Sequence, residues 1–440
     1  MESQVRGKMS SRNSERHHDS ISYRQTTFDT TSERLSLMKN YHWSFSSKDT
    51  MRFTHAIHPY VASMNPHLAS ELISRYVPAG GTVLDPFVGG GTVLVEALVK
   101  GIKSFGIDVN PLAVLVSKAK TTYIPRSEML RVYHDILAKL PIMKERELDF
   151  PKSSRISYWF KPYMHSPLTK LSRLIREIPT PELRTLFLTA LSATVRDVSL
   201  TYRGEVRLRH LREAEAKQFN PDVLEKFRQR VQLAIDRISK LPKDVSTNVE
   251  YGDAKSMPFG EREFNAIICS PPYGDDRNGV SYFQFSKNML YWLGFSEEEI
   301  SDAKGRFLGE SRSSLRPPAS DTLNSAVTTI KQNPISSNPN AIEECIAFYS
   351  DYDRSLREMS KVCSGPIIIV IGDRRLSKTF IDNAKITTEL MSNRGWRLVD
   401  HFHRVIEKKR IPVMQPNGGK RDVSGGGLIN LEHTLVYRPD

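Results

Sequence analysis

The chain has 440 residues, enough for two or three domains, and its 39% hydrophobic content suits a globular protein with a buried core. Three cysteines without a CxxC pair exclude a disulfide framework and a cysteine zinc site, and the longest apolar run, IIIVI at 367–371, is too short to span a bilayer. We therefore expect a cytoplasmic protein that holds no metal and contacts no membrane. A net charge of +13 indicates nucleic acid as the first partner to consider, with solvated surface lysines as the alternative.

Residues 1–35 are rich in Ser, Arg, Thr and His and have few large apolar side chains, which predicts a disordered arm and no signal peptide. The next segments alternate between helix and strand signals. PHLASELISRYV (66–77) and GTVLVEALVKG (91–101) have apolar residues at helical spacing, while GGTVLDPF (80–87) and SFGIDV (104–109) indicate short buried strands. The resulting β-α-β unit predicts parallel strands in an α/β sheet.

Residues 127–245 predict a helical insertion, because apolar residues recur at helical spacing in three long runs. Beyond it, short β-branched and apolar runs predict core strands, and the Pro-, Ser- and Asn-rich stretch 311–340 predicts a long surface loop. The helical runs cover 168–178, 183–198 and 223–238, and the strand runs cover 248–253, 265–270, 366–373, 396–405 and 429–438.

DPFVGGG (85–91) follows the first strand and opens a helix, so its glycines lie at the carboxyl end of a parallel strand, where α/β folds bind ligands. The turn is neither the dinucleotide pattern GxGxxG nor a P-loop with GK[ST], and by itself it is also explained as a plain turn. Asp108, at the end of the second strand, stands where a carboxylate accepts hydrogen bonds from a ribose. A turn or cap carboxylate is the alternative for Asp108.

Five segments, two of which include the strands just described, share a pattern when they are taken together and in chain order. They are IHPYVASMNPHLASELI (57–73), VLDPFVGGGTVLVEA (83–97), GIDVNPLA (106–113), YGDA (251–254) and SPPYG (270–274). Together they resemble the DNA amino-methyltransferases, the modification enzymes that act on cytosine N4 or adenine N6. The pair DPFxGxGT and SPPY, in that order and at strand ends, is the specific part of this resemblance.

The resemblance covers residues 41–291 and, more loosely, the last strands. It implies an α/β fold with a Rossmann-like methyltransferase sheet, mostly parallel with a final antiparallel strand. The chain would then consist of a cofactor half at 36–126, the helical insertion at 127–245 as a candidate DNA-recognition region, and the rest of the methyltransferase domain at 246–440. The resemblance also implies S-adenosylmethionine as methyl donor and duplex DNA as substrate, with a cognate restriction endonuclease as a candidate partner.

The same resemblance implies which residues hold S-adenosylmethionine. The glycine turn would line its methionine end, Asp108 would hold the ribose hydroxyls, and Asp253 with Ala254 would border the adenine. The segment 58–60 would close the pocket, and a helix lead-in is the alternative for it. The predicted cofactor residues are His58, Pro59, Tyr60, Asp85, Phe87, Gly89, Gly91, Thr92, Asp108, Asn110, Asp253 and Ala254.

SPPYG places a hydroxyl, two prolines and a tyrosine directly after a predicted buried strand. An exocyclic amino group is a poor nucleophile, because its lone pair is delocalised into the base. The Ser270 hydroxyl and the backbone carbonyls that Pro271 and Pro272 fix can accept both amino hydrogens and orient the nitrogen, while Tyr273 stacks on the base. We predict these four as catalytic residues that act on a base flipped out of the duplex. A simple strand end is the alternative for Pro-Pro.

The residues beside the prolines bear on which amino group is methylated. Related adenine and RNA guanine enzymes mostly have Asp or Asn before PPY, so Ser270 favours cytosine N4. Cys269 is not expected to attack a pyrimidine ring, because the carbon-5 cytosine enzymes carry a Pro-Cys pair that this chain lacks. We expect Cys269 to be a small buried residue of the sheet.

Arginines gather near the end of the helical insertion, around SLTYRGEVRLRH (199–210), where they can grip phosphates or read guanines. A solvated helix face is the alternative. The basic, glycine-rich stretch 407–427 is explained by a flexible hairpin loop, with DNA backbone contact as the second interpretation. The predicted DNA-binding residues are Arg196, Arg203, Arg207, Arg209 and Arg212.

The main hypothesis from the sequence is a site-specific methyltransferase that moves a methyl group from S-adenosylmethionine to cytosine N4 in duplex DNA, in a restriction-modification or other defence locus. A DNA adenine-N6 or RNA amino-methyltransferase is the second hypothesis. The third is a nucleic-acid-binding protein that has lost catalysis, and the presence of a complete glycine turn beside a complete SPPY argues against it.

Overall fold

The computed structural model describes residues 43, 45, 49–144, 150–202, 208–274, 282–310, 316–334, 338–405 and 431–440. These residues belong to one compact unit, His42–Asp440. The predictions for 1–35, Arg203, Arg207 and 407–427 concern residues outside this described part.

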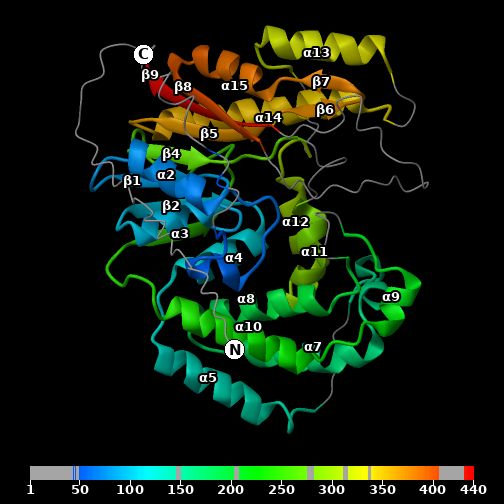
Figure 1. Cartoon of the computed structure of the whole chain (residues 1–440). Coiled ribbons are helices and arrows are strands. Elements are labelled where there is room, and N and C mark those ends of the chain that lie inside the picture. The colour runs from blue at the N-terminus through cyan, green and yellow to red at the C-terminus, as the bar shows by residue number, and fades with distance from the viewer. Residues whose placement is uncertain are drawn as a thin grey trace, which may run out of the picture. The chain divides into compact units, whose positions relative to one another are not determined.

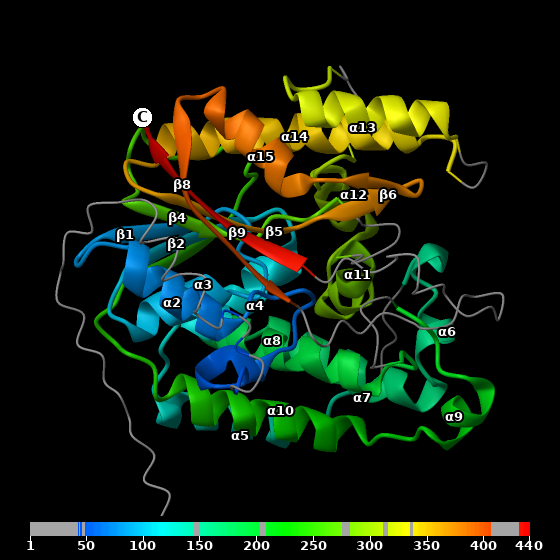
Figure 2. The ribbon, with the colours of Figure 1, turned by 45° about the horizontal axis from the view of Figure 1, so that its top comes forward.

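Seven strands form one sheet in the order β3-β2-β1-β4-β5-β9-β8 (Figure 1). The first five in this order pair in parallel, and β9 runs antiparallel to both of its neighbours, β5 and β8 (Figure 2). The predicted mostly parallel sheet with a final antiparallel strand is thereby confirmed. The strands are β1 (Thr82–Asp85), β2 (Lys103–Asp108), β3 (Thr247–Tyr251), β4 (Ala266–Cys269), β5 (Ile367–Gly372), β8 (Trp396–Val405) and β9 (Leu431–Pro439).

The centre of the sheet is apolar on both faces, and every residue of β4 and β5 is buried. Such strands are typical of a parallel sheet with helices on both sides. Ile267 and Ile369 pack with Tyr349 and Tyr352 of α14 (Ala341–Val362), in a core that also includes residues of α15 (Asn383–Ser392). Alternate strand residues point to the opposite face. On that side α2 (Pro66–Tyr76) and α3 (Thr92–Val99) contact the central strands.

Helices fill most of the chain between β2 and β3, where the sequence predicts an insertion. Its central helix α8 (Pro181–Val198) contacts α4 (Pro111–Thr121), α7 (His165–Arg176), α10 (Val223–Ile238) and α11 (Tyr282–Leu293), the last of which follows β4. Together with α5 (Arg126–Lys139) they bury one apolar core that includes Phe187, Phe227 and Trp292. The shorter helices are η1 (Phe53–Ile57), η2 (Lys152–Ser154), α6 (Ile156–Trp159), η3 (Pro162–Met164) and α9 (Glu213–Gln218).

The prediction of a long loop over 311–340 is wrong for its middle third. Asp321–Gln332 form the helix α13, whose first turn is capped by the Ser320 hydroxyl, which accepts a hydrogen bond from the Leu323 amide at 3.0 Å. Leu323, Ala326 and Ile330 are buried on one side of this helix. The Ser, Thr and Asn residues between them lie on its other faces, so the polar composition concealed an apolar stripe at helical spacing.

Two further elements lie next to residues of the candidate site in the chain or in space, and the sequence did not predict them. One is the short hairpin β6 (Arg374–Leu376) and β7 (Thr379–Ile381), which directly follows β5. The other is α12 (Glu297–Gly305), which follows α11. Within the described residues, no helix is both long and apolar enough to cross a bilayer.

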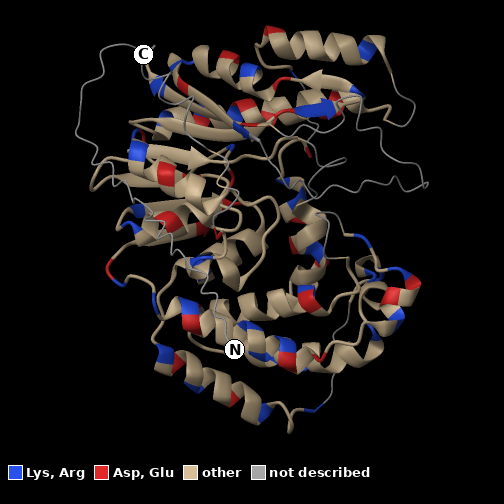
Figure 3. Ribbon diagram, in the orientation of Figure 1, with Lys and Arg blue, Asp and Glu red and all other residues tan. Residues whose placement is uncertain are grey.

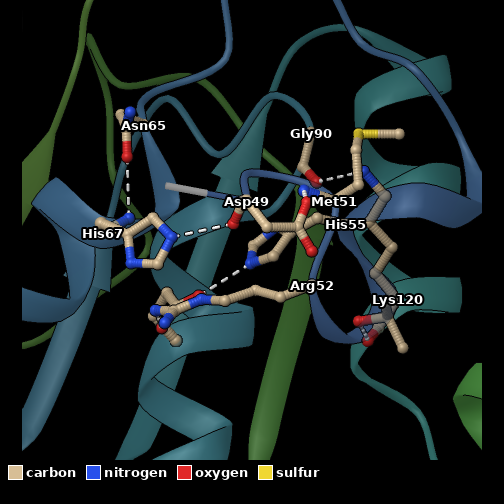
Figure 4. A network of polar contacts seen from close by, with 10 residues as sticks. Asp49, Met51, Arg52, His55, Asn65, His67, Gly90 and Lys120 are labelled. Atoms are coloured by element: carbon tan, nitrogen blue, oxygen red, sulfur yellow. Dashed lines mark hydrogen bonds and ion pairs between the residues drawn. The ribbon is translucent and has the colours of Figure 1, made fainter. Parts of the chain in front are cut away.

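A network of buried polar groups ties the segment before α2 to the helices beneath the glycine turn (Figure 4). Glu96 of α3, which is 1% exposed, accepts hydrogen bonds from Arg52 Nε at 3.1 Å and is paired with His55 Nε2 at 2.8 Å. Thr54 Oγ1 donates to the carbonyl of Lys120 at 2.7 Å. The segment from Arg52 to His55 is therefore held against α3 and α4 by hydrogen bonds to Glu96 and Lys120.

Burial disfavours the charged form of Lys120, a member of this network. Its ammonium is buried and donates to the Gly90 carbonyl, in the turn between β1 and α3, at 3.1 Å. Burial lowers the pKa of Lys120 from its ordinary value of 10.5 to about 7. Below about pH 7 the folded and unfolded chains both carry this charge, and the folded chain bears the full cost of burying it. Between about pH 7 and 10.5 only the unfolded chain binds the proton, so stability should rise with pH.

We expect Lys120→Met to remove this dependence. The free energy of unfolding of the wild type, relative to that of the variant, should rise from pH 7 to pH 10 by at most about 1.4 kcal/mol per pH unit. Denaturant titrations at several pH values measure this difference. The same substitution at the exposed Lys100 is the control and should give parallel curves. Parallel curves for Lys120→Met as well would contradict the assignment.

Candidate active site

The carboxyl ends of β1, β2 and β4 meet at one edge of the sheet and border an open pocket of about 800 Å³, counting the solvent space at its mouth. The pocket brings together residues from motifs that lie up to about two hundred positions apart in the chain. Ten predicted site residues line it: Tyr60, Asp85, Phe87, Gly89, Thr92, Asp108, Asp253, Ala254, Ser270 and Pro272.

The glycine turn is shaped by contacts that only glycine permits. Gly89 has a φ of +47°, in the left-handed region, and its amide donates to Asp108 Oδ2 at 2.9 Å. A Cβ at Gly90 would lie 2.9 Å from Tyr60 Cβ, closer than real side chains approach. The turn therefore packs closely against Tyr60, and at Gly89 and Gly90 it presents backbone to the pocket.

Two carboxyl groups line the pocket beside the glycine turn, and both are kept from ionising freely. Asp85 is 4% exposed and accepts a hydrogen bond from the Phe87 amide at 3.0 Å. Burial, reinforced by the nearby Asp108, raises the pKa of Asp85 to about 8, and burial raises the pKa of Asp108 to about 6. At neutral pH Asp85 is thus mostly protonated, and a cation bound beside it would favour its ionised form.

Three predicted cofactor residues lie behind the pocket wall instead of lining it. His58 is fully buried, with Nε2 3.0 Å from Ser192 Oγ of α8. Asn110 donates from Nδ2 to Tyr60 Oη at 2.9 Å and caps α4 by accepting from the Leu112 amide at 3.1 Å. Gly91 begins α3 with a φ of +78° and allows it to pack on Ser117 of α4. These residues support the wall.

Pro59, the remaining member of the predicted set, is exposed and does not line the pocket. Sequence reasoning also missed much of the opposite wall. Tyr282 at the start of α11, Lys255 after β3, and the segment Arg306–Leu308 after α12 line the pocket as well. The Lys255 ammonium pairs with Asp253 Oδ2 at 3.1 Å and donates to the Arg306 carbonyl at 2.6 Å. It thereby links the loop after β3 to the segment after α12.

SPPYG follows β4 directly, and its residues divide between the pocket and the sheet. Ser270 and Pro272 line the pocket, whereas Pro271 is buried. Tyr273 is turned towards β5 and β9. Its hydroxyl donates to Glu432 Oε1 at 2.7 Å, and a Cβ at Gly372 would lie 2.8 Å from its ring. Cys269 is fully buried in β4, as predicted, and burial raises the pKa of its thiol well above the usual value.

Two buried side chains that carried no sequence signal hold the backbone of this motif. Asn383, at the start of α15, donates from Nδ2 to the Tyr273 carbonyl at 3.2 Å and to the Gly372 carbonyl at 2.7 Å. Arg374 of β6 donates from Nη1 to the Gly274 carbonyl. The carbonyls of Tyr273 and Gly274 therefore each already accept a hydrogen bond within the protein.

The described arginines of the predicted DNA-binding set differ in exposure. Arg196 donates to Thr201 Oγ1 at 3.0 Å and lies over the Phe285 ring, so it is built into the helical core. Arg209 lies over Tyr202, and Arg212, just before α9, is exposed. Figure 3 shows Lys and Arg interspersed with Asp and Glu along α9 and α10. The DNA-binding role of this region stays a prediction.

The described residues contain no group of three or more His, Cys, Asp or Glu side chains arranged to hold a metal ion.

Comparisons with known proteins show which family this chain is similar to. The DNA methylase family model matches residues 4–119. The type II methyltransferase M.MvaI of Kocuria varians is 29% identical over 401 residues, which cover 85% of this chain and 88% of that protein. The type II methyltransferase M.BsoBI of Geobacillus stearothermophilus is 22% identical over 331 residues, 62% of this chain and 61% of that protein.

A solved structure described as a SAM-dependent methyltransferase of Methanosarcina mazei covers 84% of this chain and 96% of its own, at 9% identity and a TM-score of 0.29. That score is too low to carry an argument. The family model and the type II methyltransferase relatives support assignment of this chain to the DNA amino-methyltransferase family.

Proposed function

We propose that this protein methylates the N4 amino group of cytosine in duplex DNA, with S-adenosylmethionine as donor. The observation that carries the proposal is the meeting of Ser270 and the glycine turn in one pocket, at the ends of the adjacent strands β4 and β1. A hydroxyl and a carbonyl-rich loop suit an amino group, and the glycine backbone at the end of β1 suits a closely held cofactor. Adenine N6 is the competing target.

The pocket fits the proposed cofactor by its charge and shape. Bound S-adenosylmethionine supplies a methyl group on a positively charged sulfonium. Three carboxyl groups of the pocket, those of Asp85, Asp108 and Asp253, suit the positive charges and hydroxyls of that molecule. Phe87 and Ala254 offer apolar contacts beside them.

The motif residues would then orient the target base. Ser270 accepts an amino hydrogen, and the rigid Pro271-Pro272 backbone fixes a carbonyl for the other. A base reaches this pocket only when it leaves the duplex stack, so the proposal includes base flipping. Because two curated relatives are named type II methyltransferases, we propose the modification half of a restriction-modification system as the setting, with an endonuclease as partner.

The product tests the proposed reaction. DNA treated with the protein and labelled S-adenosylmethionine, then digested to nucleosides, should contain label in N4-methylcytosine, identified by mass. Label in N6-methyladenine would transfer the assignment to adenine, and label found only in RNA would refute DNA as the substrate. Protein with Ser270→Ala is the control for contaminating activity and should transfer little or no label.

Cofactor affinity should depend on pH through Asp85. Because the pKa of Asp85 is about 8, binding of a cation near it should release a proton at neutral pH. Affinity for S-adenosylmethionine should rise from pH 6 to pH 8 and then level off. Calorimetry in two buffers of different ionisation enthalpy measures the released proton.

Asp85→Asn should weaken S-adenosylmethionine binding and abolish this proton release, because the amide does not titrate. Asp135→Asn, at an exposed position of α5, is the matched control and should bind as the wild type does. If Asp85→Asn binds with unchanged affinity and unchanged proton release, Asp85 has no part in the cofactor site.

DNA binding should depend on the arginines at the end of the helical insertion. Replacing Arg203, Arg207 and Arg209 together by Gln should lower affinity and reduce the slope of log K against log salt, by about one unit for each lost phosphate contact. Replacing Arg126, Arg131 and Arg228, which are exposed on α5 and α10, removes the same charge as a control. Equal slopes for both triple variants would locate the DNA contact elsewhere.

A further inference from the structure

A buried carboxylate that the proposed reaction does not use lies beside the end of β5. Glu432 of β9 is 6% exposed and lies opposite Gly372 of β5 in the antiparallel register. Because Gly372 has no side chain, the Tyr273 ring lies over it and its hydroxyl reaches Glu432. The last strand of the sheet thereby contacts the catalytic motif through one side chain.

We propose that Glu432 fixes the direction of a hydrogen-bonded chain that runs through Tyr273 to Ser270 and makes Ser270 an acceptor for the target amino group. This inference rests on the proposed function and deepens it. Glu432 and Tyr273 are positioning residues in this account, since they act through Ser270.

The direction of the chain follows from the donors available. An ionised carboxylate only accepts hydrogen bonds, so the single proton of the Tyr273 hydroxyl goes to Glu432 Oε1, at 2.7 Å. Burial, and then the charge of Glu432, raises the pKa of Tyr273 well above its ordinary value, which keeps that proton on the tyrosine. The Tyr273 oxygen is then left as an acceptor, and the Ser270 hydroxyl, 3.4 Å away, must donate to it.

The consequence for Ser270 is that its own proton points away from the pocket. Its lone pairs remain for hydrogens of the target amino group, which is the polarity that the proposed reaction needs. At 3.4 Å the link between Ser270 and Tyr273 is long for a bond between hydroxyls, and such bonds shorten when a site closes on its substrate.

Both ends of the chain are held in place. Arg404 of β8 donates from Nε to Glu432 Oε2 at 2.5 Å, so the second carboxylate oxygen is occupied and the first faces Tyr273. Asn383 holds the Tyr273 carbonyl, which fixes the backbone from which the ring projects. A carboxylate one layer behind the pocket thus orients a neutral hydroxyl within it.

Tyr273→Phe and Glu432→Gln test the chain. Tyr273→Phe keeps the aromatic ring and any stacking on the base, and loses only the hydroxyl. We expect each variant to lower the single-turnover rate of methyl transfer to DNA roughly tenfold, at saturating DNA and cofactor, with dissociation constants for both ligands unchanged. The double variant should be no slower than Tyr273→Phe alone, because both changes break the same chain.

Tyr76→Phe is the matched control. The Tyr76 hydroxyl also donates to a buried carboxylate, Asp400 Oδ2 at 2.9 Å, but far from SPPYG in the chain and outside the pocket lining. Its rate of methyl transfer should equal that of the wild type. Thermal melting of each variant shows whether it is folded, and Glu432→Gln alone still tests the chain if Tyr273→Phe does not fold.

The outcomes separate this inference from the proposed function. A wild type that methylates DNA, with a Tyr273→Phe variant at full rate, overturns the chain and leaves the proposed function standing. The chain is also overturned if the double variant is slower than wild type by the product of the two single-variant factors, because that result means that the two residues act independently. A wild type that transfers no methyl group to DNA overturns the proposed function and this inference with it.

Discussion

The parallel pairing of β1 with β4 is the constraint on which the site depends. Val83 and Leu84 pair with Ala266 and Ile267, so two motifs separated by the whole helical insertion end at the same edge of the sheet. This register places Asp85 and Ser270 around one pocket. Since the central strands are packed on both faces, a one-residue shift of the register would move each side chain to the opposite face, disrupt the packing there and disperse the site in the same step.

Behind the pocket, a second layer of side chains gives the site its shape. Asn110 holds Tyr60, Lys120 holds the glycine turn, and Asn383 holds the proline motif. Each of these three side chains is buried, and its polar atoms form hydrogen bonds within the protein. The residues that would touch substrate and cofactor are thus oriented by residues that touch neither, which is how a site acquires its geometry before its ligands arrive.

The sequence allowed the strands of the main sheet and much of the pocket lining to be predicted, because β-branched runs and the two motifs are local signals. It could not assign Glu432, Asn383 or Arg374 to the site, since their contacts with SPPYG arise only from the strand order β4-β5-β9 and from the hairpin after β5. For His58 and Gly91 the sequence had the opposite effect, because it assigned to the pocket two residues that do not line it. Each belongs to a family motif, and each supports the wall without lining the pocket.

The antiparallel strand β9 has a consequence for how this chain folds. It is the last strand along the sequence, yet it lies between β5 and β8, which meet only through it. Until Leu431–Pro439 are in place, the edge of β5 offers the unpaired backbone of an entirely apolar strand, Ile367–Gly372. Such an edge pairs readily with strands of other chains. A chain cut short before Leu431 would thus be a template for aggregation, so completion of the sheet also protects the protein from its own core strand.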